Sequence, residues 1–251
     1  MKGNKGFVNE FDLQKSTIRV IAKNSPFVIA KLLSIGDLSF HFRKLLTEDE
    51  VNLIANQVNA LNWVPVGKDG ILKNYNENDE IGSWRLTCYE PNLAEAIWSR
   101  MKTAFPSVRI MNDLSPTDWD GSYEWEPIGI NPAFRFIRYN KNEHLIPHYD
   151  APYIQDHSVR SLSSLVIYLS DNHDSGSTRF LKDDQIELPL SDRNYDDWTK
   201  EAGEELVIHK VNPEKGDALI FDHRILHDSE RVKGEQVKTI IRTDIMYRRV
   251  R

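Results

Sequence analysis

The second half of this 251-residue sequence changes its pattern at Ala133. From there on, short apolar and β-branched segments are separated by turn signals such as Ser175-Gly176-Ser177, and none of them has helical periodicity. The expected strands are residues 134–139, 162–169, 178–181, 206–210, 218–221 and 238–247. Several short strands without intervening helices favour a β-sandwich or a jelly roll.

The first half, residues 1–125, is expected to be a helical support region packed on a β core that spans residues 126–251. Thr47 and Glu50 have the spacing of a capping box, and apolar residues then recur at helical spacing. Residues 91–105 predict a second amphipathic helix. The predicted fold class is therefore α+β with a mainly β core.

Two further segments of the first half are less regular. Residues 84–89 predict a strand. Residues 25–35 fit either a strand or a short helix, and their pattern does not decide between the two.

Charge is concentrated in one segment. Residues 182–205 hold nine acidic and three basic residues, which matches the formal charge of −6 for the whole chain. The remainder is about neutral, which argues against a nucleic-acid partner. We expect residues 182–205 to be an acidic insertion or lid between strands, where their charge would attract a cationic partner.

The chain has a single cysteine, Cys88, which excludes an internal disulfide framework and fits a reducing, cytoplasmic environment. The N-terminus lacks the continuous apolar region of a secretory signal. The apolar stretch 20–35 is interrupted by Lys23, Pro26 and Lys31, so no membrane span is expected. The oligomeric state is left open.

A candidate metal site begins at His148-Tyr149-Asp150, the one place where a His is followed two residues later by an acidic residue. On an extended strand these two side chains project to the same face. With a third ligand they would form the facial triad associated with non-heme Fe(II), and His227 is the best candidate. His223 is its nearest competitor. A helical pair of His148 with His144 is disfavoured by Pro147 between them.

The predicted strand 238–247 carries cations. Lys238, Ile240, Arg242 and Asp244 share one face, which could hold an acidic cosubstrate near the metal. The alternative is that Lys238 and Arg242 lie on the solvated face of an edge strand.

Residues 130–250 resemble the Fe(II)/2-oxoglutarate-dependent oxygenases, and within them the prolyl 4-hydroxylase-like branch. The resemblance is carried, in order, by Phe-Arg-Phe-Ile-Arg-Tyr139, His148-Tyr-Asp150, Val-Ile-Tyr168-Leu-Ser-Asp, Gly176-Ser-Thr178-Arg-Phe180, Lys-Gly216-Asp-Ala-Leu-Ile-Phe221, His227 and residues 238–247. It implies a double-stranded β-helix, a jelly-roll barrel open at one end. The sequence departs from the family at Gly176-Ser177, where two Gly are more usual.

The resemblance also implies the cofactors and their ligands. His148, Asp150 and His227 would bind Fe(II), and 2-oxoglutarate would chelate the metal. Its C5 carboxylate would need a cation, for which Lys238 is favoured over Arg242. Lys238 lies eleven residues after His227, one more than this branch leads us to expect, so both candidates stay open. By the same resemblance, the cosubstrate site would also include the hydroxyl groups of Tyr139 and Tyr168.

The expected function is hydroxylation of an unactivated C–H bond with release of succinate and CO2, using O2 and with ascorbate as a stimulant. The substrate would be an amino-acid-like small molecule or a peptidyl residue of the prolyl type, with Arg179 and Tyr149 as candidate contacts. A jelly-roll module that binds metal or 2-oxoglutarate without catalysis is the alternative, and a metal-free structural sandwich is a third hypothesis.

Overall fold

The computed structural model describes residues 11–36, 38–70, 80–107, 109–112, 122–185, 188–189, 192 and 199–250. Its helices are α1 (Lys15–Lys23), α2 (Glu48–Val58) and α3 (Pro91–Met101), with short 3-10 turns η1 (Lys102–Ala104) and η4 (Glu204–Leu206). Its strands are β1 (Ile29–Leu32), β2 (Phe40–Arg43), β3 (Val64–Gly67), β4 (Ile81–Tyr89), β5 (Arg109–Asn112), β6 (Ser122–Ile130), β7 (Ala133–Tyr139), β8 (Leu145–His148), β9 (Val159–Tyr168), β10 (Thr178–Leu181), β11 (Val207–Val211), β12 (Ala218–Asp222), β13 (His227–Ser229) and β14 (Lys238–Arg249).

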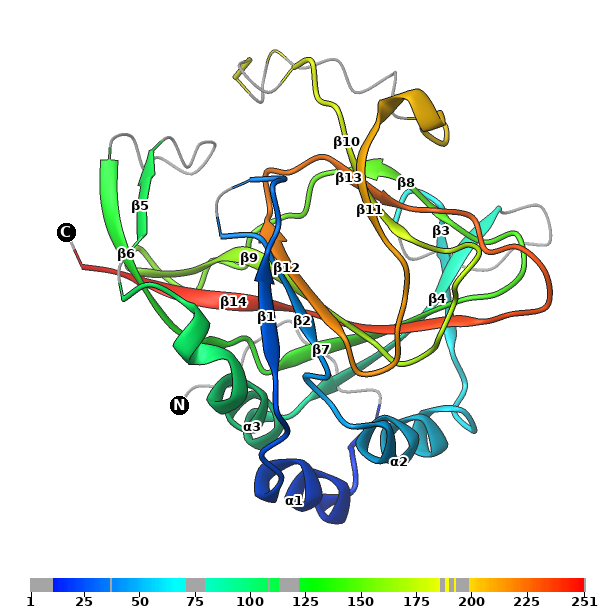
Figure 1. Ribbon diagram of the computed structural model, residues 1–251, viewed down its shortest axis with the longest axis horizontal. Helices are drawn as coiled ribbons and strands as arrows, with labels where there is room; N and C mark the ends of the chain where they lie inside the picture. Colours follow the sequence, from blue (N-terminus) through cyan, green and yellow to red (C-terminus); the bar gives the residue numbers. More distant parts are fainter. Residues whose placement is uncertain are drawn as a thin grey trace.

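Within the described residues, the strands form two sheets (Figure 1). The large sheet has the order β1-β2-β12-β9-β14-β7-β4-β3, with β6 also pairing β14 and β5 pairing β6. The small sheet has the order β11-β10-β13-β8. Phe180 and Val211 of the small sheet pack with Tyr168 and Leu219 of the large one in a single apolar cluster. The fold is therefore the expected double-stranded β-helix.

The two central strands, β9 and β14, are buried along nearly their whole length because both of their faces are covered. Leu165 and Ile167 of β9 belong to a cluster shared with the helices, whereas Val166 and Tyr168 belong to the cluster between the sheets. Because both faces of these strands are buried, the alternation assigns successive residues to one of the two cores.

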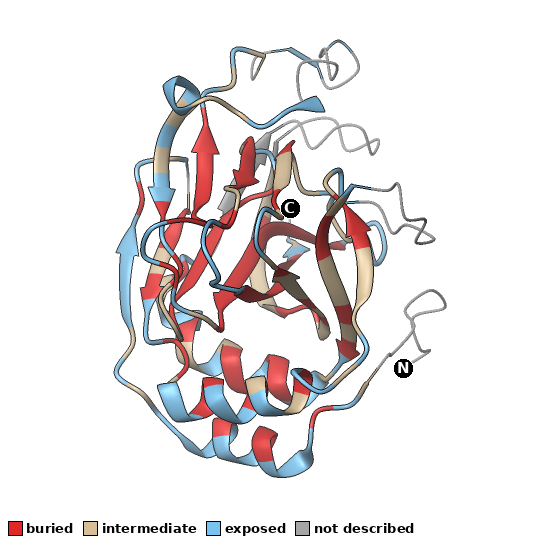
Figure 2. Cartoon of the chain, turned by 90° about the vertical axis from the view of Figure 1, so that its right-hand side faces the viewer, coloured by how far each residue is buried: buried red, intermediate tan, exposed pale blue. Residues whose placement is uncertain are grey.

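The three helices lie together against the outer face of the large sheet (Figure 1). α1 contacts both α2 and α3, and α3 also contacts β6. Figure 2 shows buried residues on the helices and on the strands above them. The cluster under the sheet joins Ile97 of α3 to Ile241 of β14, so the helices close one side of the core.

The predicted elements agree with this arrangement. Each of the six strands expected after Ala133 is present, and the capping box at Thr47 and Glu50 starts α2. Residues 25–35, whose pattern did not decide between a strand and a short helix, contain strand β1. The region before residue 125 differs in one respect, because it also contributes strands β1 to β5 to the large sheet and is not only helical. No described helix is long and apolar enough to cross a membrane.

One buried ion pair fastens the helices to each other. Arg100 of α3 donates two hydrogen bonds to the carboxylate of Glu50 in α2, at 2.7 and 2.9 Å, and a further one to the carbonyl oxygen of Ile21 in α1. Burial opposes the charged form of Glu50, but hydrogen bonds from Arg100, Thr47 and Asn24 outweigh it and hold its pKa below the usual value. Both charges of the pair are therefore present at neutral pH.

We expect Glu50→Gln to destabilise the protein by about 3–5 kcal/mol, because it leaves the buried Arg100 guanidinium without its counterion. Urea denaturation measures the loss. Glu48→Gln, an exposed position in the same turn of α2, is the control and should change the free energy of unfolding by less than about 1 kcal/mol. Equal losses in the two variants would contradict the role given to the ion pair.

Candidate metal and cosubstrate site

The two histidines of the candidate site meet because their strands pair. His148 is the last residue of β8 and His227 the first of β13, and the two are directly opposite each other in the small sheet. Their ring centroids are 4.3 Å apart. One nitrogen of each ring and one oxygen of Asp150 all lie within 4.8 Å of one another. The structure thus brings together the three side chains that the sequence singled out.

Backbone carbonyl groups orient both imidazole rings. Nδ1 of His148 is 2.8 Å from the carbonyl oxygen of Ile146, and Nδ1 of His227 is 2.9 Å from that of Ile225. If each Nδ1 carries the proton and donates it to its carbonyl, each Nε2 keeps a lone pair. These Nε2 atoms lie 3.9 and 3.6 Å from the carboxylate oxygens of Asp150.

Asp150 is held from the large sheet. Arg242 of β14 places Nη2 3.1 Å from one carboxylate oxygen, and Ser164 of β9 donates a hydrogen bond to the other. Burial alone would raise the pKa of the Asp150 carboxyl, but Arg242, His227 and His148 hold it well below its usual range. Burial and the neighbouring His148 lower the pKa of His227 to about 3, despite the nearby Asp150. The trio is thus a carboxylate with a neutral imidazole at His227, the protonation states that a divalent cation requires.

A pocket extends from this trio into the space between the sheets. Its lining includes His148, Asp150 and His227 and also Tyr139 of β7 and Lys238 of β14. Lys238 and Arg242 share the inner face of β14, as the alternation predicted, and both are buried. The alternative, that they lie on a solvated edge strand, is wrong because β14 is central in the large sheet.

Lys238 is a buried cation without a carboxylate counterion among the described residues. Its Nζ donates to Oγ of Ser229, 2.7 Å away, and lies 5.0 Å from the ring centroid of Tyr139. Burial lowers the pKa of Lys238 to about 7, and Asp228 and Glu230 offset part of that effect. Arg242 differs, since Asp150 and Asp244 both pair with it. Lys238 is the cation that an anionic ligand would best stabilise.

The two remaining predicted hydroxyl groups, those of Tyr139 and Tyr168, lie at different distances from the pocket. Tyr139 is buried and lines the pocket. Tyr168 is fully buried, and its hydroxyl is 2.8 Å from Oγ1 of Thr178, which lines the pocket. Tyr168 therefore reaches the pocket wall through Thr178.

Two other histidines were weighed from the sequence. His223 is buried, with its Nε2 3.5 Å from an oxygen of Asp244, and it is not one of the clustered metal-binding candidates. His144 faces Arg231, with Nε2 3.4 Å from Nη2. Neither competes with His227 as the third member of the trio.

The two candidate substrate contacts lie elsewhere. Arg179 was one candidate, but it is paired with Asp228 across β10 and β13 and donates two hydrogen bonds to that carboxylate. It also contacts Ala202 and Glu204. Tyr149 donates its hydroxyl to Asp183. Because Arg179 alternates with Thr178 and Phe180 along β10, it projects to the outer face of the small sheet.

These contacts fix the two ends of the acidic insertion. Asp183 and residues 201–204 are bound to Tyr149, Arg179 and Arg231, the last of which pairs with Glu201. Residues 186–187, 190–191 and 193–198 of the segment lie outside the described residues.

Three residues were not anticipated: Ser229 and Thr178, which line the pocket, and Ser164, which donates a hydrogen bond to Asp150. Ser229 follows His227 by two residues, so the same alternation that linked His148 to Asp150 would have placed it on the same face. Thr178 and Ser164 are set by strand register, for which the sequence has no local signal.

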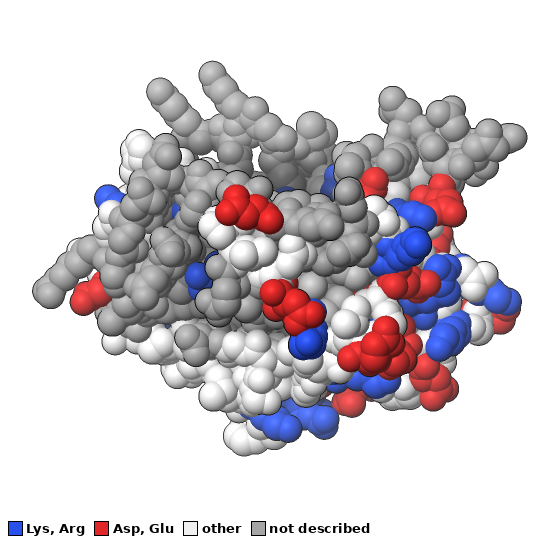
Figure 3. Space-filling model, turned by 90° about the horizontal axis from the view of Figure 1, so that it is seen from above, with Lys and Arg blue, Asp and Glu red and all other residues white. Residues whose placement is uncertain are grey.

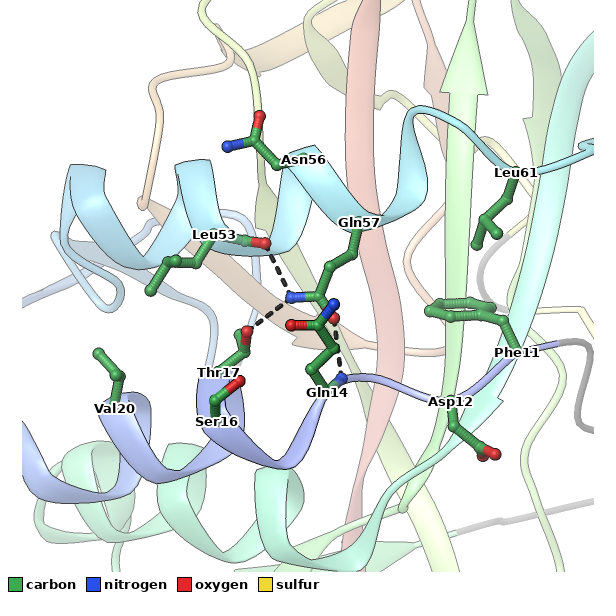
Figure 4. A pocket seen from close by; sticks show the side chains of 10 residues that line it. All are labelled: Phe11, Asp12, Gln14, Ser16, Thr17, Val20, Leu53, Asn56, Gln57 and Leu61. Atoms are coloured by element: carbon green, nitrogen blue, oxygen red, sulfur yellow. Dashed lines mark hydrogen bonds between the residues drawn. The ribbon is translucent and has the colours of Figure 1, made fainter.

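A larger cavity, about 560 Å³, lies between α1 and α2 (Figure 4). Its lining includes one carboxylate, Asp12, and no basic side chain. Gln57 crosses it to Oγ1 of Thr17 and to the carbonyl oxygen of Leu53 (Figure 4). Without a cluster of titratable groups it offers no catalytic arrangement, so the smaller pocket at the trio is the better candidate.

Comparison with known proteins agrees with the family expected from the motifs. Residues 134–243 match the model of the 2OG-Fe(II) oxygenase superfamily. This confirms the predicted resemblance and the predicted class of enzyme, a 2-oxoglutarate-dependent oxygenase. No curated protein matches.

Among solved structures, the chain is similar to the epimerase SnoN from nogalamycin biosynthesis, with 12% identity, a TM-score of 0.50 and coverage of 94% of this chain and 82% of that one. It is also similar to a prolyl-4-hydroxylase of Pseudomonas putida, with 13% identity, a TM-score of 0.46 and coverage of 93% and 97%. A third similar structure is a viral collagen prolyl hydroxylase from Paramecium Bursaria Chlorella virus-1, with 15% identity, a TM-score of 0.48 and coverage of 85% of this chain and 97% of that one. At 12% identity, the similarity to SnoN is one of fold.

If His148, Asp150 and His227 bind a divalent cation, Mn(II) or Ni(II) at 100 times its dissociation constant should raise the melting temperature by about 5–10 °C. His227→Ala should abolish the shift, and calorimetric titration should detect no tight site. The control is His157→Ala, which changes an exposed histidine on the loop after Asp150. This variant should keep both the shift in melting temperature and the tight metal site. An undiminished shift in His227→Ala would place the metal elsewhere.

Proposed function

We propose that this chain, a member of the 2OG-Fe(II) oxygenase superfamily over residues 134–243, is a dioxygenase that hydroxylates an unactivated C–H bond with release of succinate and CO2. The observation that carries the proposal is one pocket with a His-Asp-His trio and a buried, unpaired Lys238 in its lining. The trio suits a cation, and Lys238 suits the anionic end of a cosubstrate that also reaches that cation.

The donor set of the trio fits Fe(II), since two imidazole nitrogens and one carboxylate form the facial triad typical of non-heme iron. His148 and His227 would hold the metal through Nε2, with Nδ1 fixed by the carbonyl oxygens of Ile146 and Ile225. Bound Fe(II) would supply the O2 chemistry. Arg242 would act as a positioning residue, because its contact with Asp150 restricts the orientation of that carboxylate.

For 2-oxoglutarate, we assign the C5 carboxylate to Lys238. Ser229 already accepts a hydrogen bond from its ammonium group, and Thr178 and Tyr139 line the same pocket. Tyr168 would support this site through Thr178. Arg242 is less suited to the role because Asp150 and Asp244 already share its charge.

The rest of the chain would serve this site. Residues 126–251 would form the oxygenase core, residues 1–125 would support it, and residues 182–205 would be a lid at the barrel. Charges of both signs alternate over part of the face in Figure 3, which fits the expectation of no nucleic-acid partner. We keep the cytoplasm as the proposed location, and an amino-acid-like molecule or a peptidyl residue of the prolyl type as the substrate.

Purified protein supplied with Fe(II), ascorbate, O2 and 2-oxoglutarate should release succinate, slowly alone and faster with a substrate. His148→Ala should lower this turnover by about 100-fold or more, because the metal loses a ligand. Binding of 2-oxoglutarate without any succinate, across a broad panel of substrates, would instead favour the non-catalytic binding module. Unchanged turnover in His148→Ala would contradict the proposed iron site.

Binding of 2-oxoglutarate should weaken as the pH rises above 7. Burial lowers the pKa of Lys238 to about 7 in the free protein, so a lysine that must be protonated to hold a carboxylate becomes harder to charge above that pH. The dissociation constant should then rise by up to about tenfold per pH unit. Calorimetric titration between pH 6.5 and 9 measures the slope.

Lys238→Arg should remove most of this slope while retaining binding, since a guanidinium stays protonated throughout that range. Lys238→Met should bind weakly at every pH. A slope that persists unchanged in Lys238→Arg would mean that a different group titrates.

A further inference from the structure

A second basic group lies on the inner face of the large sheet. Arg135 of β7 is directly opposite Arg242 of β14 on one side and Thr87 of β4 on the other. Along β7 it shares a face with Ile137 and Tyr139, which both line the cosubstrate pocket. Arg135 therefore continues the inner surface of the barrel beyond that pocket.

Moving along the sheet from Lys238, the inner face passes through Ile240 and Ile137 before it reaches Arg242 and Arg135. Asp150 is bound to Arg242 at this level. Arg135 thus lies on the side of the metal trio that is away from the proposed C5 carboxylate of 2-oxoglutarate. A substrate that approached the trio from the side opposite the proposed cosubstrate would meet Arg135.

Arg135 is unpaired within the part of the chain that the structure describes. Arg242 has Asp150 and Asp244 as partners, whereas no hydrogen bond or ion pair is recorded for Arg135. Its nitrogens are not among the buried atoms without a partner, so the guanidinium is partly buried but still reached by solvent. A bound anion could approach it.

The surroundings favour an anion at this position. Burial lowers the pKa of Arg135 and neighbouring Arg242 and Arg85 lower it further, while Asp244 and Asp150 partly compensate. Arginine nevertheless stays protonated. A partly desolvated guanidinium next to another guanidinium gains from a counterion, and its planar donors match a carboxylate in bidentate geometry.

On the basis of the function proposed above, we propose that Arg135 binds a carboxylate of the substrate, which is therefore a small molecule with a free carboxylate, such as an amino acid. A residue inside a peptide chain has no carboxylate of its own backbone to offer there. Arg179, an arginine that the sequence offered as a candidate substrate contact, is occupied by Asp228. Arg135 takes its place as the residue that determines specificity.

The test uses the full chain with Fe(II), ascorbate and 2-oxoglutarate, and a panel of free L-amino acids and short carboxylic acids, each paired with its primary amide. Succinate release above the substrate-free rate reports coupling. We expect stimulation by one or more acids and at least about tenfold less by the matching amides, since a charged hydrogen-bonded pair is lost.

Arg135→Gln should lower kcat/KM for the stimulating acid by roughly 10–100-fold, mainly through KM. It should leave the substrate-free succinate rate and the affinity for 2-oxoglutarate within about twofold of wild type, as expected for a residue outside that pocket. Arg135→Lys should recover part of the loss. Arg138→Gln is the control, because Arg138 lies on the opposite face of β7, bound to Asn59 and stacked on Trp63.

Three results would overturn the assignment. The first is stimulation by amides or internal peptides equal to that by acids, and the second is a normal response of Arg135→Gln. The third is a panel without any stimulating acid. If one of these results were obtained while the wild-type protein still formed succinate without substrate, only the proposed role of Arg135 would fail. If it formed no succinate under any condition, the proposed function itself would fail.

Discussion

The candidate metal site depends on the pairing of β8 with β13. This short antiparallel contact sets His148 opposite His227 and joins segments far apart in the sequence. Each ring is then fixed by the carbonyl oxygen of the residue two positions earlier, and Asp150 follows on the same chain segment. Strand pairing thus brings the two imidazole rings together, and Arg242 and Ser164 of the large sheet hold Asp150 beside them.

The second constraint is the burial of charge in the large sheet. β14 crosses the centre of the molecule and brings Lys238, Arg242 and Asp244 into an interior that would otherwise exclude them. Arg242 pairs with Asp244 and also contacts the carboxylate of Asp150. Lys238 has only neutral polar neighbours close by, so its charge is stabilised fully only when an anion binds. Binding of an anionic cosubstrate and completion of the core are therefore coupled.

Much of the fold could be predicted from the sequence because its strands obey strict alternation. β9 and β14 have strong apolar patterns, and the resemblance added their order. The short strands β8 and β13 were not predicted. β8 has only four residues and includes Pro147, and β13 has three residues that are all polar. β1 was ambiguous because all of its residues are exposed, so no periodicity marks a buried face.

The site was predictable to a similar extent. His148, Asp150 and His227 could be selected from local spacing together with the family motifs. Arg179 could not be placed correctly, because its pairing with Asp228 depends on the register between β10 and β13. Arg135 carries no motif, and its relevance appears only once β7 is seen beside β14. Register between distant strands is the information that a single sequence lacks.

The most direct measurement is an anomalous-difference map at the iron edge, from crystals grown without oxygen in the presence of Fe(II) and 2-oxoglutarate. The proposed site predicts one strong peak bound by both Nε2 atoms and the Asp150 carboxylate, with the cosubstrate reaching from that peak to Nζ of Lys238. A peak that lacked His227 as a ligand, or a cosubstrate directed away from Lys238, would contradict it.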